Sequence, residues 1–408
     1  MERPAPDLQS AGYALDREDP RRRAAYKWEP AMKNVRFVGL DVHAETIAVA
    51  VAEVDGEVRS LGIIPNRAES IGRLMRKLGK PEQLRVCYEA GPTGYVLYWQ
   101  LSELGVKCEV VAPTLVPVKA GDRVKTDRRD AAKLARCYRS GDLTAVWVPD
   151  AAHEALRDLV RARLAAKRDQ LRARHRLSKF LLRHGRRAPE GTSAWTEKYL
   201  QWVRSAVPFE HTAQEITRGD YLHEVEHAAE RVARLERSID AAIDTLPVKM
   251  RAVIDGLQSL RGIAQISAVT IMAELGELSR FTHARQLMAY SGTVSSEHTS
   301  GERVRRGPIS KTGNAHLRRI VVEAAWAYRH RPAVGKTLAV RQRRSSAAVT
   351  ALAWKAQQRL HHRYVRLMGR GKSKQQTVTA VGRELLGFIW AIGVHVEREL
   401  DLPQRQAA

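Results

Sequence analysis

The sequence predicts an α/β domain followed by a largely helical remainder. Three observations lead to this fold class: short apolar runs bounded by turn residues fill the region from residue 35 to 113, long amphipathic stretches at helical spacing follow it, and further helical stretches extend to about residue 400. We divide the chain into a disordered arm, an α/β domain, a basic helical coiled-coil segment, a helical domain with a long polar loop, and a tail, at residues 1–34, 35–150, 151–249, 250–400 and 401–408.

The first domain begins with strands and then alternates helices and strands. Three apolar strands come first, with an Asp55-Gly56 turn signal between the second and the third. We expect an open sheet, and in such sheets functional sites gather where strands end. The predicted strands are 35–42, 46–54, 57–64, 84–90 and 107–113, and the predicted helices are 68–78, about 93–104 and one that begins near residue 126.

The later segments are typical of helices joined by loops. Apolar residues at helical spacing predict long helices at 151–184 and 212–246, which form either an antiparallel hairpin or a dimerising coiled coil. Residues 257–281 predict two short helices around a Gly-containing turn, an arrangement similar to a helix-hairpin-helix. Residues 290–314 predict a functional or disordered loop, because they are polar, Gly-rich and without a period. Helices resume at 316–328.

The charge of the chain is strongly positive and unevenly distributed. The formal net charge is +24, and Lys and Arg outnumber Asp and Glu by 17 to 15 in residues 35–150, by 12 to 3 in 151–189 and by 19 to 2 in 301–380. Such a surplus favours a nucleic acid partner over an anionic membrane. We find no run of about 18 apolar residues that predicts a transmembrane helix, no secretory signal and no CxxC zinc motif. We therefore expect a cytoplasmic protein without a membrane partner.

Four carboxylates occupy positions that favour catalysis. Asp41 and Glu89 end two predicted strands, and Asp127 and Asp130 share one helix face at i and i+3. Mg²⁺ prefers hard oxygen ligands, and two such ions clamp the attacking and leaving oxygens of a phosphodiester. The alternative is a solvated helix face for the aspartates and a helix-dipole acid for Glu89. The adjoining cations are candidates to hold phosphates: Arg123, Lys125, Arg128 and Arg129.

Four blocks of the sequence are similar to a known family. They are "GLDVHAETIAVAV", "YEAGPTGY", "KTDRRDAAKLA" and "TSGERVRRGPISKTGNAHLRR", and the similarity extends from about residue 35 to 395. They resemble the DEDD transposases of an insertion-sequence family, whose catalytic domain is RuvC-like and RNase H-like. The resemblance implies a RuvC-like DEDD catalytic domain at 35–150 and a C-terminal transposase domain at 250–400. It also implies that the acids that bind Mg²⁺ are Asp41, Glu89, Asp127 and Asp130.

The same resemblance implies a serine nucleophile and nucleic acid partners. The Ser-Gly pair that precedes a basic run in the family corresponds to Ser300-Gly301, with Ser296 as the second candidate. A serine hydroxyl that attacks a phosphodiester retains the energy of that bond in a phosphoseryl link. The implied partners are element DNA, target DNA and a structured bridge RNA, and we expect a homodimer or homotetramer. The cations that we expect to stabilise charge at phosphorus are Arg303, Arg305, Arg306 and Lys311.

The first long helix carries a basic face that predicts backbone contacts to RNA or DNA. Its candidate nucleic-acid-binding residues include Arg161, Lys167, Arg168 and Arg172. The predicted function is an RNA-guided transposase that excises and inserts an insertion sequence. Three alternatives remain at this point: a RuvC-like junction nuclease that uses metal-activated water, an actin-like sugar kinase or ATPase with a similar first phosphate loop, and a non-catalytic nucleic-acid-binding protein.

Overall fold

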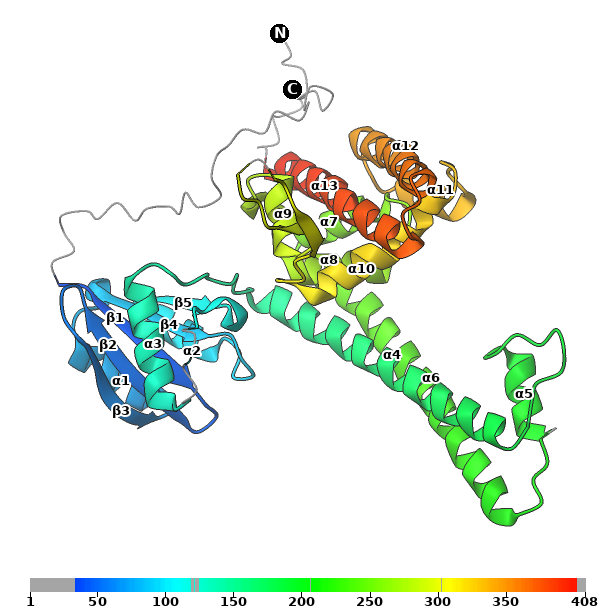
Figure 1. Cartoon of the computed structure of the whole chain (residues 1–408), viewed down its shortest axis with the longest axis horizontal. Helices are drawn as coiled ribbons and strands as arrows, with labels where there is room; N and C mark the ends of the chain where they lie inside the picture. Colours follow the sequence, from blue (N-terminus) through cyan, green and yellow to red (C-terminus); the bar gives the residue numbers. More distant parts are fainter. Residues whose placement is uncertain (1–33, 119–120, 122–124, 206, 302, 402–408) are drawn as a thin grey trace, which may run out of the picture. The chain divides into compact units, whose positions relative to one another are not determined.

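The structure of the chain, a computed structural model, divides into two compact units, Met1–Val148 and Pro149–Ala408. It describes residues 34–401 apart from 119–120, 122–124, 206 and 302 (Figure 1). Arg123 lies outside the described residues. So do the predicted N-terminal arm, apart from residue 34, and the predicted tail, apart from residue 401.

The first unit contains a five-stranded sheet with the order β3-β2-β1-β4-β5. The first three strands pair antiparallel, while β4 runs parallel to β1 and β5 runs parallel to β4. The mixed α/β sheet and the positions of its five strands confirm the prediction. The strands are β1 (Arg36–Val42), β2 (Thr46–Glu53), β3 (Val58–Pro65), β4 (Leu84–Glu89) and β5 (Lys107–Val111).

Helices cover both faces of this sheet. Side chains of α1 (Ala68–Leu78) and α2 (Val96–Glu103) share a core with Leu40 and Ile47, whereas α3 (Asp127–Arg139) packs on Ala48 and Ala50, which point to the opposite face. The interior of β2 is a continuous apolar run because both of its faces are covered. The first strand therefore lies between two layers of helices, and α3 lies on the face that Ala48 and Ala50 also line.

Gly39 brings α3 unusually close to β1. A Cβ atom at this position would lie 2.3 Å from the carbonyl oxygen of Ala131 and 2.4 Å from the amide nitrogen of Ala135. Both contacts are with backbone, so no side-chain rotation relieves them. Glycine is thus the residue that permits this helix–strand approach, and Asp41 follows it two positions later.

The second unit begins with two long helices that pack against each other, α4 (Ala151–Arg183) and α6 (Thr212–Thr245) (Figure 1). Arg163 pairs with Glu236 and Arg176 with Glu224, so residue numbers rise along one helix as they fall along the other. The pair is therefore antiparallel, as one of the two predicted arrangements requires. A short helix that we did not predict, α5 (Glu197–Ser205), packs near the far end of the pair.

The remaining helices, apart from α11, contribute side chains to one core with the near end of that pair. Leu156 of α4 and Ile239 of α6 belong to the same buried cluster as residues from the C-terminal helices. The helices are α7 (Val248–Gln258), α8 (Gln265–Leu275), α9 (Ala284–Tyr290), α10 (Ala315–Ala325), α11 (Lys336–Gln342), α12 (Ala347–Gly369) and α13 (Lys374–Asp401).

Helix α13 is long and apolar. It contains no uninterrupted run of about 18 apolar residues, but by length and composition alone it is apolar enough to cross a membrane. The reason is its position: it packs against α7, α9, α10 and α12, and 61% of its most apolar window is buried. A helix surrounded by other helices is apolar on most of its sides, as a membrane-spanning helix is.

The segment predicted as an irregular loop contains a short β-hairpin. Strands β6 (Ser295–Glu297) and β7 (Arg306–Ile309) pair antiparallel. Neither strand is long enough to show a period of two in the sequence, which explains why the pattern predicted only a loop. The name serine hairpin is used here for residues 295–309, which include Ser300.

Candidate active site

Asp41 and Glu89 lie at the same edge of the sheet. They belong to the neighbouring parallel strands β1 and β4, whose register pairs Leu40 with Tyr88 immediately before them. The carboxyl ends of two adjacent parallel strands meet at one edge. The structure therefore brings these two predicted acids together.

The start of α3 brings the two aspartates to this edge. Asp127 is the first residue of α3 and Asp130 lies in its first turn, while the Thr126 hydroxyl accepts a hydrogen bond from the Arg129 amide as the N-cap. The close approach at Gly39 holds this end of α3 over β1.

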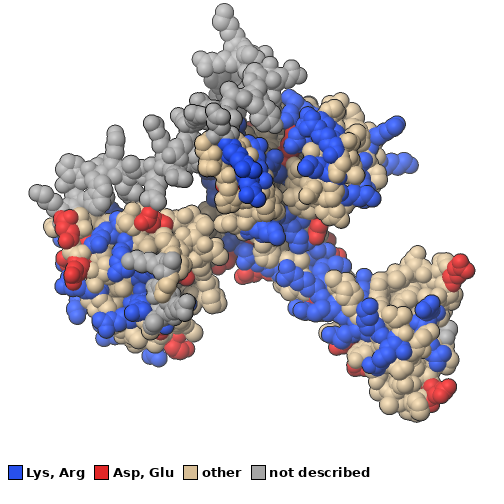
Figure 2. All heavy atoms as spheres, in the orientation of Figure 1, with Lys and Arg blue, Asp and Glu red and all other residues tan. Residues whose placement is uncertain are grey.

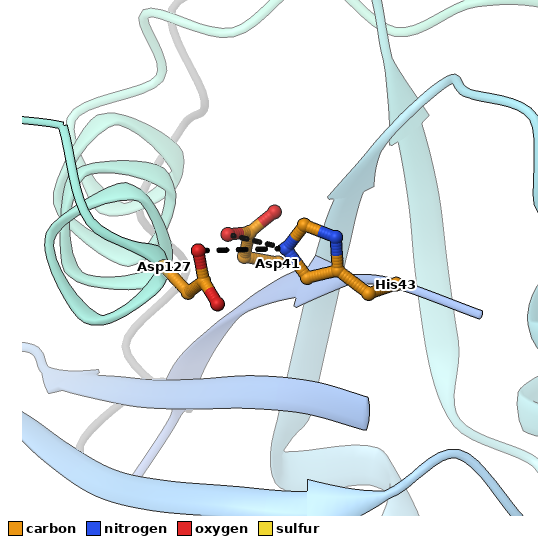
Figure 3. Close-up of side chains that lie close together, drawn as sticks. All are labelled: Asp41, His43 and Asp127. Atoms are coloured by element: carbon orange, nitrogen blue, oxygen red, sulfur yellow. Dashed lines mark ion pairs between the residues drawn. The ribbon is translucent and has the colours of Figure 1, made fainter. Parts of the chain in front are cut away.

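The ring of His43 faces both Asp41 of the strand and Asp127 of the helix (Figure 3). Its Nε2 atom is 3.4 Å from Oδ2 of Asp41 and 3.6 Å from Oδ1 of Asp127. The metal ligands expected from the sequence are the four acids and do not include His43. The sequence signal for His43 is its position two residues after Asp41. The turn between β1 and β2, in which the His43 amide donates to the Thr46 carbonyl oxygen at 2.9 Å, keeps it at the edge of the sheet.

The pKa shifts indicate that the four acids interact. Burial raises the pKa of Asp41, His43 lowers it, and the negative charges of Asp130 and Asp127 raise it again. Burial also raises the pKa of Glu89, as do Asp130 and Asp41, against the opposing effect of nearby lysines. Like charges gathered this closely repel one another unless a cation lies between them.

The residues of this site fit a divalent metal ion. Asp41, His43 and Asp127 each offer a ligand atom, and these atoms lie within 4.8 Å of one another. Carboxylate oxygens are the ligands that Mg²⁺ and Mn²⁺ prefer, whereas an imidazole nitrogen is more typical of Zn²⁺, Cu, Fe and Ni sites. Glu89 and Asp130 would complete the acidic lining, either as further ligands or through ordered water.

Cations lie beside the acids, on the first turn of α3 and immediately before it. Nζ of Lys125 is 3.9 Å from Oδ2 of Asp130, and its side chain is 89% exposed. Arg128 and Arg129 are exposed on the first turn of α3. Lys125, Arg128 and Arg129 therefore lie beside the acids at the exposed start of α3.

Ser300 lies in the turn of the serine hairpin and is exposed. Ser300 and Arg303 exchange backbone hydrogen bonds of 3.4 and 3.2 Å, and Gly301 between them has a φ of +57°, which favours glycine. The Ser296 hydroxyl instead donates to the Pro308 carbonyl oxygen across the hairpin, at 3.1 Å. Of the two candidate serines, Ser300 is the one at the turn.

The predicted cations of this segment are exposed around the turn. Arg303 and Arg305 lie between the turn and β7, and Nε of Arg306 is 3.7 Å from Oε2 of Glu297. Lys311 has a φ of +57° and follows β7. The serine hydroxyl is thus presented on a strongly basic loop.

Comparisons with known proteins decide the class of the chain. A family model described as transposase matches residues 38–185, which hold the four acids, and one described as transposase of the IS116/IS110/IS902 family matches residues 255–339, which hold the serine hairpin. A putative transposase of Sinorhizobium fredii, y4qE, is 45% identical over 87% of this chain and 88% of that relative. The chain belongs to the IS116/IS110/IS902 family of transposases. The transposase for insertion sequence element IS1533 of Leptospira borgpetersenii is 32% identical over 84% of this chain and 99% of its own length.

Membership of this transposase family implies an enzyme that cleaves and rejoins DNA to move an insertion sequence. It favours phosphodiester chemistry over the sugar kinase or ATPase that the first strand also resembles.

A buried glutamate of the transposase, which sequence reasoning missed, holds the base of the serine hairpin. Glu274 in α8 has a fully buried side chain and accepts two hydrogen bonds of 2.9 Å from Arg161. Asn314 donates a third, at 2.8 Å, and the Tyr290 hydroxyl donates to the Glu274 carbonyl oxygen at 3.3 Å. Tyr290 and Asn314 flank the hairpin, and the Asn314 amide also donates to the Tyr290 carbonyl oxygen at 2.9 Å. We call Glu274, Arg161 and Asn314 the hairpin junction.

The predicted nucleic-acid-binding residues of α4 differ in their surroundings. Arg161 is engaged in the hairpin junction, Lys167 donates to Gln170 at 2.8 Å, and Arg172 pairs with Asp169 on its own helix. Arg168 is exposed. Arg161 thus has a structural partner that the sequence did not indicate, because Glu274 lies 113 residues away along the chain.

Proposed function

We propose that this chain is an RNA-guided DNA transposase that excises and inserts its element through a phosphoseryl intermediate. Asp41, Glu89, Asp127 and Asp130 bind Mg²⁺, and Ser300 is the nucleophile. The observation that carries the proposal is the convergence of acids from two strands and one helix on a single edge of the sheet, in a chain of this family.

The proposed chemistry uses the serine in two balanced steps. The Ser300 oxygen forms a bond to phosphorus while the bond from phosphorus to one sugar oxygen breaks; the hydroxyl proton is released and the departing sugar oxygen is protonated. A sugar hydroxyl of the new strand then attacks the same phosphorus and releases serine. Mg²⁺ at the acids would polarise the phosphodiester and offset its charge. Arg303, Arg305 and Lys311 would stabilise the charge on the equatorial oxygens.

The proposed partners are element DNA, target DNA and a structured bridge RNA. The support is charge: Lys and Arg outnumber Asp and Glu by 19 to 2 in residues 301–380, and exposed cations flank both the acids and the serine. The guide RNA rests on the resemblance of the four sequence blocks alone. We propose a homodimer or homotetramer that acts in the cytoplasm, because recombination must hold several strand ends at once.

A RuvC-like junction nuclease is the second candidate function. It needs only the acids, with metal-activated water as the nucleophile, and the acidic site is complete within the first unit. In that case Ser300 would have no role in the reaction.

A denaturing gel distinguishes these two functions. Purified protein, Mg²⁺, RNA transcribed from the flanks of the gene, and labelled junction and target DNA should give a protein–DNA adduct. Ser300→Ala and Asp127→Asn should abolish the adduct, while Ser296→Ala and Glu69→Gln, an exposed acid on α1, should retain it. Cleavage that persists in Ser300→Ala without any adduct in the wild type would support the junction nuclease.

A further inference from the structure

The surface of α11 and α12 has a composition that the serine chemistry does not explain. Residues 324–383 contain 14 Lys and Arg and 3 His, and no Asp or Glu. In the described part of the chain, only Asp255 and Glu384 form ion pairs with these cations, through Arg344, Arg359 and Arg363. Most of this charge therefore has no internal counterion. Figure 2 shows Lys and Arg side chains over this end of the second unit.

Helix α12 arranges its exposed side chains in two adjacent stripes. Residues at spacings of three and four share a helix face. One stripe is cationic and its members are exposed: Lys355, Arg359, His362, Arg366 and, just past the helix end, Arg370. The other contains the exposed Trp354, Gln358 and Val365, together with the half-buried His361, whose Nδ1 lies 3.1 Å from the Tyr328 carbonyl oxygen.

Trp354 is the unusual member of the second stripe. Its side chain is 41% exposed, whereas Trp390 of the same unit is partly buried and donates from its indole to the Phe281 carbonyl oxygen. The buried residues of α12, including Ala353 and Leu360, point away from it into the core. Burying an indole normally stabilises a fold, so one left in water beside a row of cations indicates a ligand with a flat apolar face and negative charge.

We propose that this face of α12 binds an unpaired stretch of nucleic acid, with a base stacked on Trp354 and its phosphates along the cationic stripe. Stacking on an exposed aromatic beside a basic track is how proteins hold single strands without reading their sequence. A duplex has its bases stacked internally and offers Trp354 no face. A membrane surface fits less well, because insertion needs several large apolar side chains, and this stripe also contains Gln358 and His361.

The proposal rests on the proposed function only in taking nucleic acid as the ligand. It assigns α12 a binding role and not a chemical one. Binding can therefore be measured in Ser300→Ala, and failure of the serine mechanism would leave this readout intact.

The test compares single-stranded and duplex binding by the full-length protein. Fluorescence anisotropy would use labelled oligonucleotides of about 12 nucleotides, a length within the usual single-strand site size, as RNA, as DNA and as duplex. Trp354→Ala should weaken single-strand binding about 5- to 150-fold, the loss of one stacked base, and leave duplex binding unchanged. Trp354→Phe should retain most of the affinity.

A matched control separates stacking from a general effect of losing an exposed indole. Trp99 is 40% exposed and lies on α2 of the first unit. Trp99→Ala should bind single strands as the wild type does. Replacing Lys355 and Arg366 together with Gln should reduce the slope of log affinity against log salt by about 1.4 for single strands.

Unchanged single-strand binding in Trp354→Ala would overturn the proposal, and so would an equal loss of duplex binding in that variant. An equal loss of single-strand binding in Trp99→Ala would also overturn it. So would a Trp354→Ala variant that loses binding to anionic vesicles but keeps its binding to single strands. An equal loss for RNA and DNA would support stacking that ignores the sugar. A loss for RNA alone would also support the proposal and identify unpaired RNA as the occupant. A single strand carrying 5-iodouracil should photocrosslink to the α12 peptide in the wild type and not in Trp354→Ala.

Discussion

Glu274→Ala is expected to destabilise the second unit by about 3 kcal/mol, at the lower end of the cost of breaking a buried ion pair. The carboxylate is fully buried and accepts two hydrogen bonds from Arg161 and one from Asn314. Breaking a buried ion pair costs about 3–5 kcal/mol. The lower end of that range applies because the Arg161 side chain is 43% exposed and regains water once its partner is gone.

Urea unfolding of the full chain, with hydrogen exchange at the amides of α8 and α10, would measure this change. The control is Glu236→Ala, which breaks the pair with Arg163 on the same helix α4. There both side chains are partly exposed, at 39% and 22%, so the expected loss is within about 1 kcal/mol. A loss for Glu274→Ala no larger than that of the control would refute the role of the hairpin junction.

The pH dependence of stability gives a second readout of the same group. Burial raises the pKa of Glu274, but the hydrogen bonds from Arg161 and Asn314 outweigh it, so the folded pKa lies below the usual value. A depressed folded pKa means that the stabilisation is present above about pH 4.5, the unfolded value, and is lost as pH falls through the folded pKa. Glu274→Gln should flatten that acid limb of the stability curve.

Three further predictions follow from other parts of the chain. Gly39→Ala should force α3 away from β1, lower the free energy of unfolding by about 1–3 kcal/mol and abolish DNA cleavage. Its control is Gly219→Ala, at an open position in α6, which should raise the free energy of unfolding in urea by up to about 1 kcal/mol. Asp41→Asn should abolish metal-dependent cleavage while leaving duplex binding, measured by anisotropy, intact or stronger, since it removes a negative charge. Burial raises the pKa of Cys108 to about 12. This thiol should therefore resist iodoacetamide near neutral pH until urea unfolds the first unit. Labelling of Cys108 in the folded protein as fast as in the urea-unfolded protein would contradict this.

The strands and the long helices could be predicted because their sequence patterns are local. The apolar run that ends in Asp41 and the run that ends in Glu89 each predict a strand with an acid at its end, and the i, i+3 spacing of Asp127 and Asp130 predicts a shared helix face. The gathering of the four acids at one edge could not be predicted from these local patterns, because it depends on which strands are neighbours in the sheet. The structure confirms the gathering through the parallel register of β1 and β4 and the approach of α3 at Gly39.

The parts that sequence reasoning missed depend on distant partners. Glu274 looks like an isolated acid in an apolar helix, and only the fold brings Arg161 and Asn314 to it. Helix α5 has nine residues and follows a stretch rich in small and polar residues, so its period is too short to detect. The apolar character of α13 does not appear as one uninterrupted run, because Arg383 and Glu384 divide it into two shorter apolar stretches.

The measurement that tests the central claim most directly is mass spectrometry of the trapped protein–DNA complex. After nuclease digestion, the account predicts a phosphorylated or nucleotide-bearing serine at Ser300, formed only with Mg²⁺ and absent from Asp127→Asn. A modification at another hydroxyl would contradict the assignment of Ser300. Magnesium-dependent cleavage with no modified residue would contradict the covalent mechanism itself.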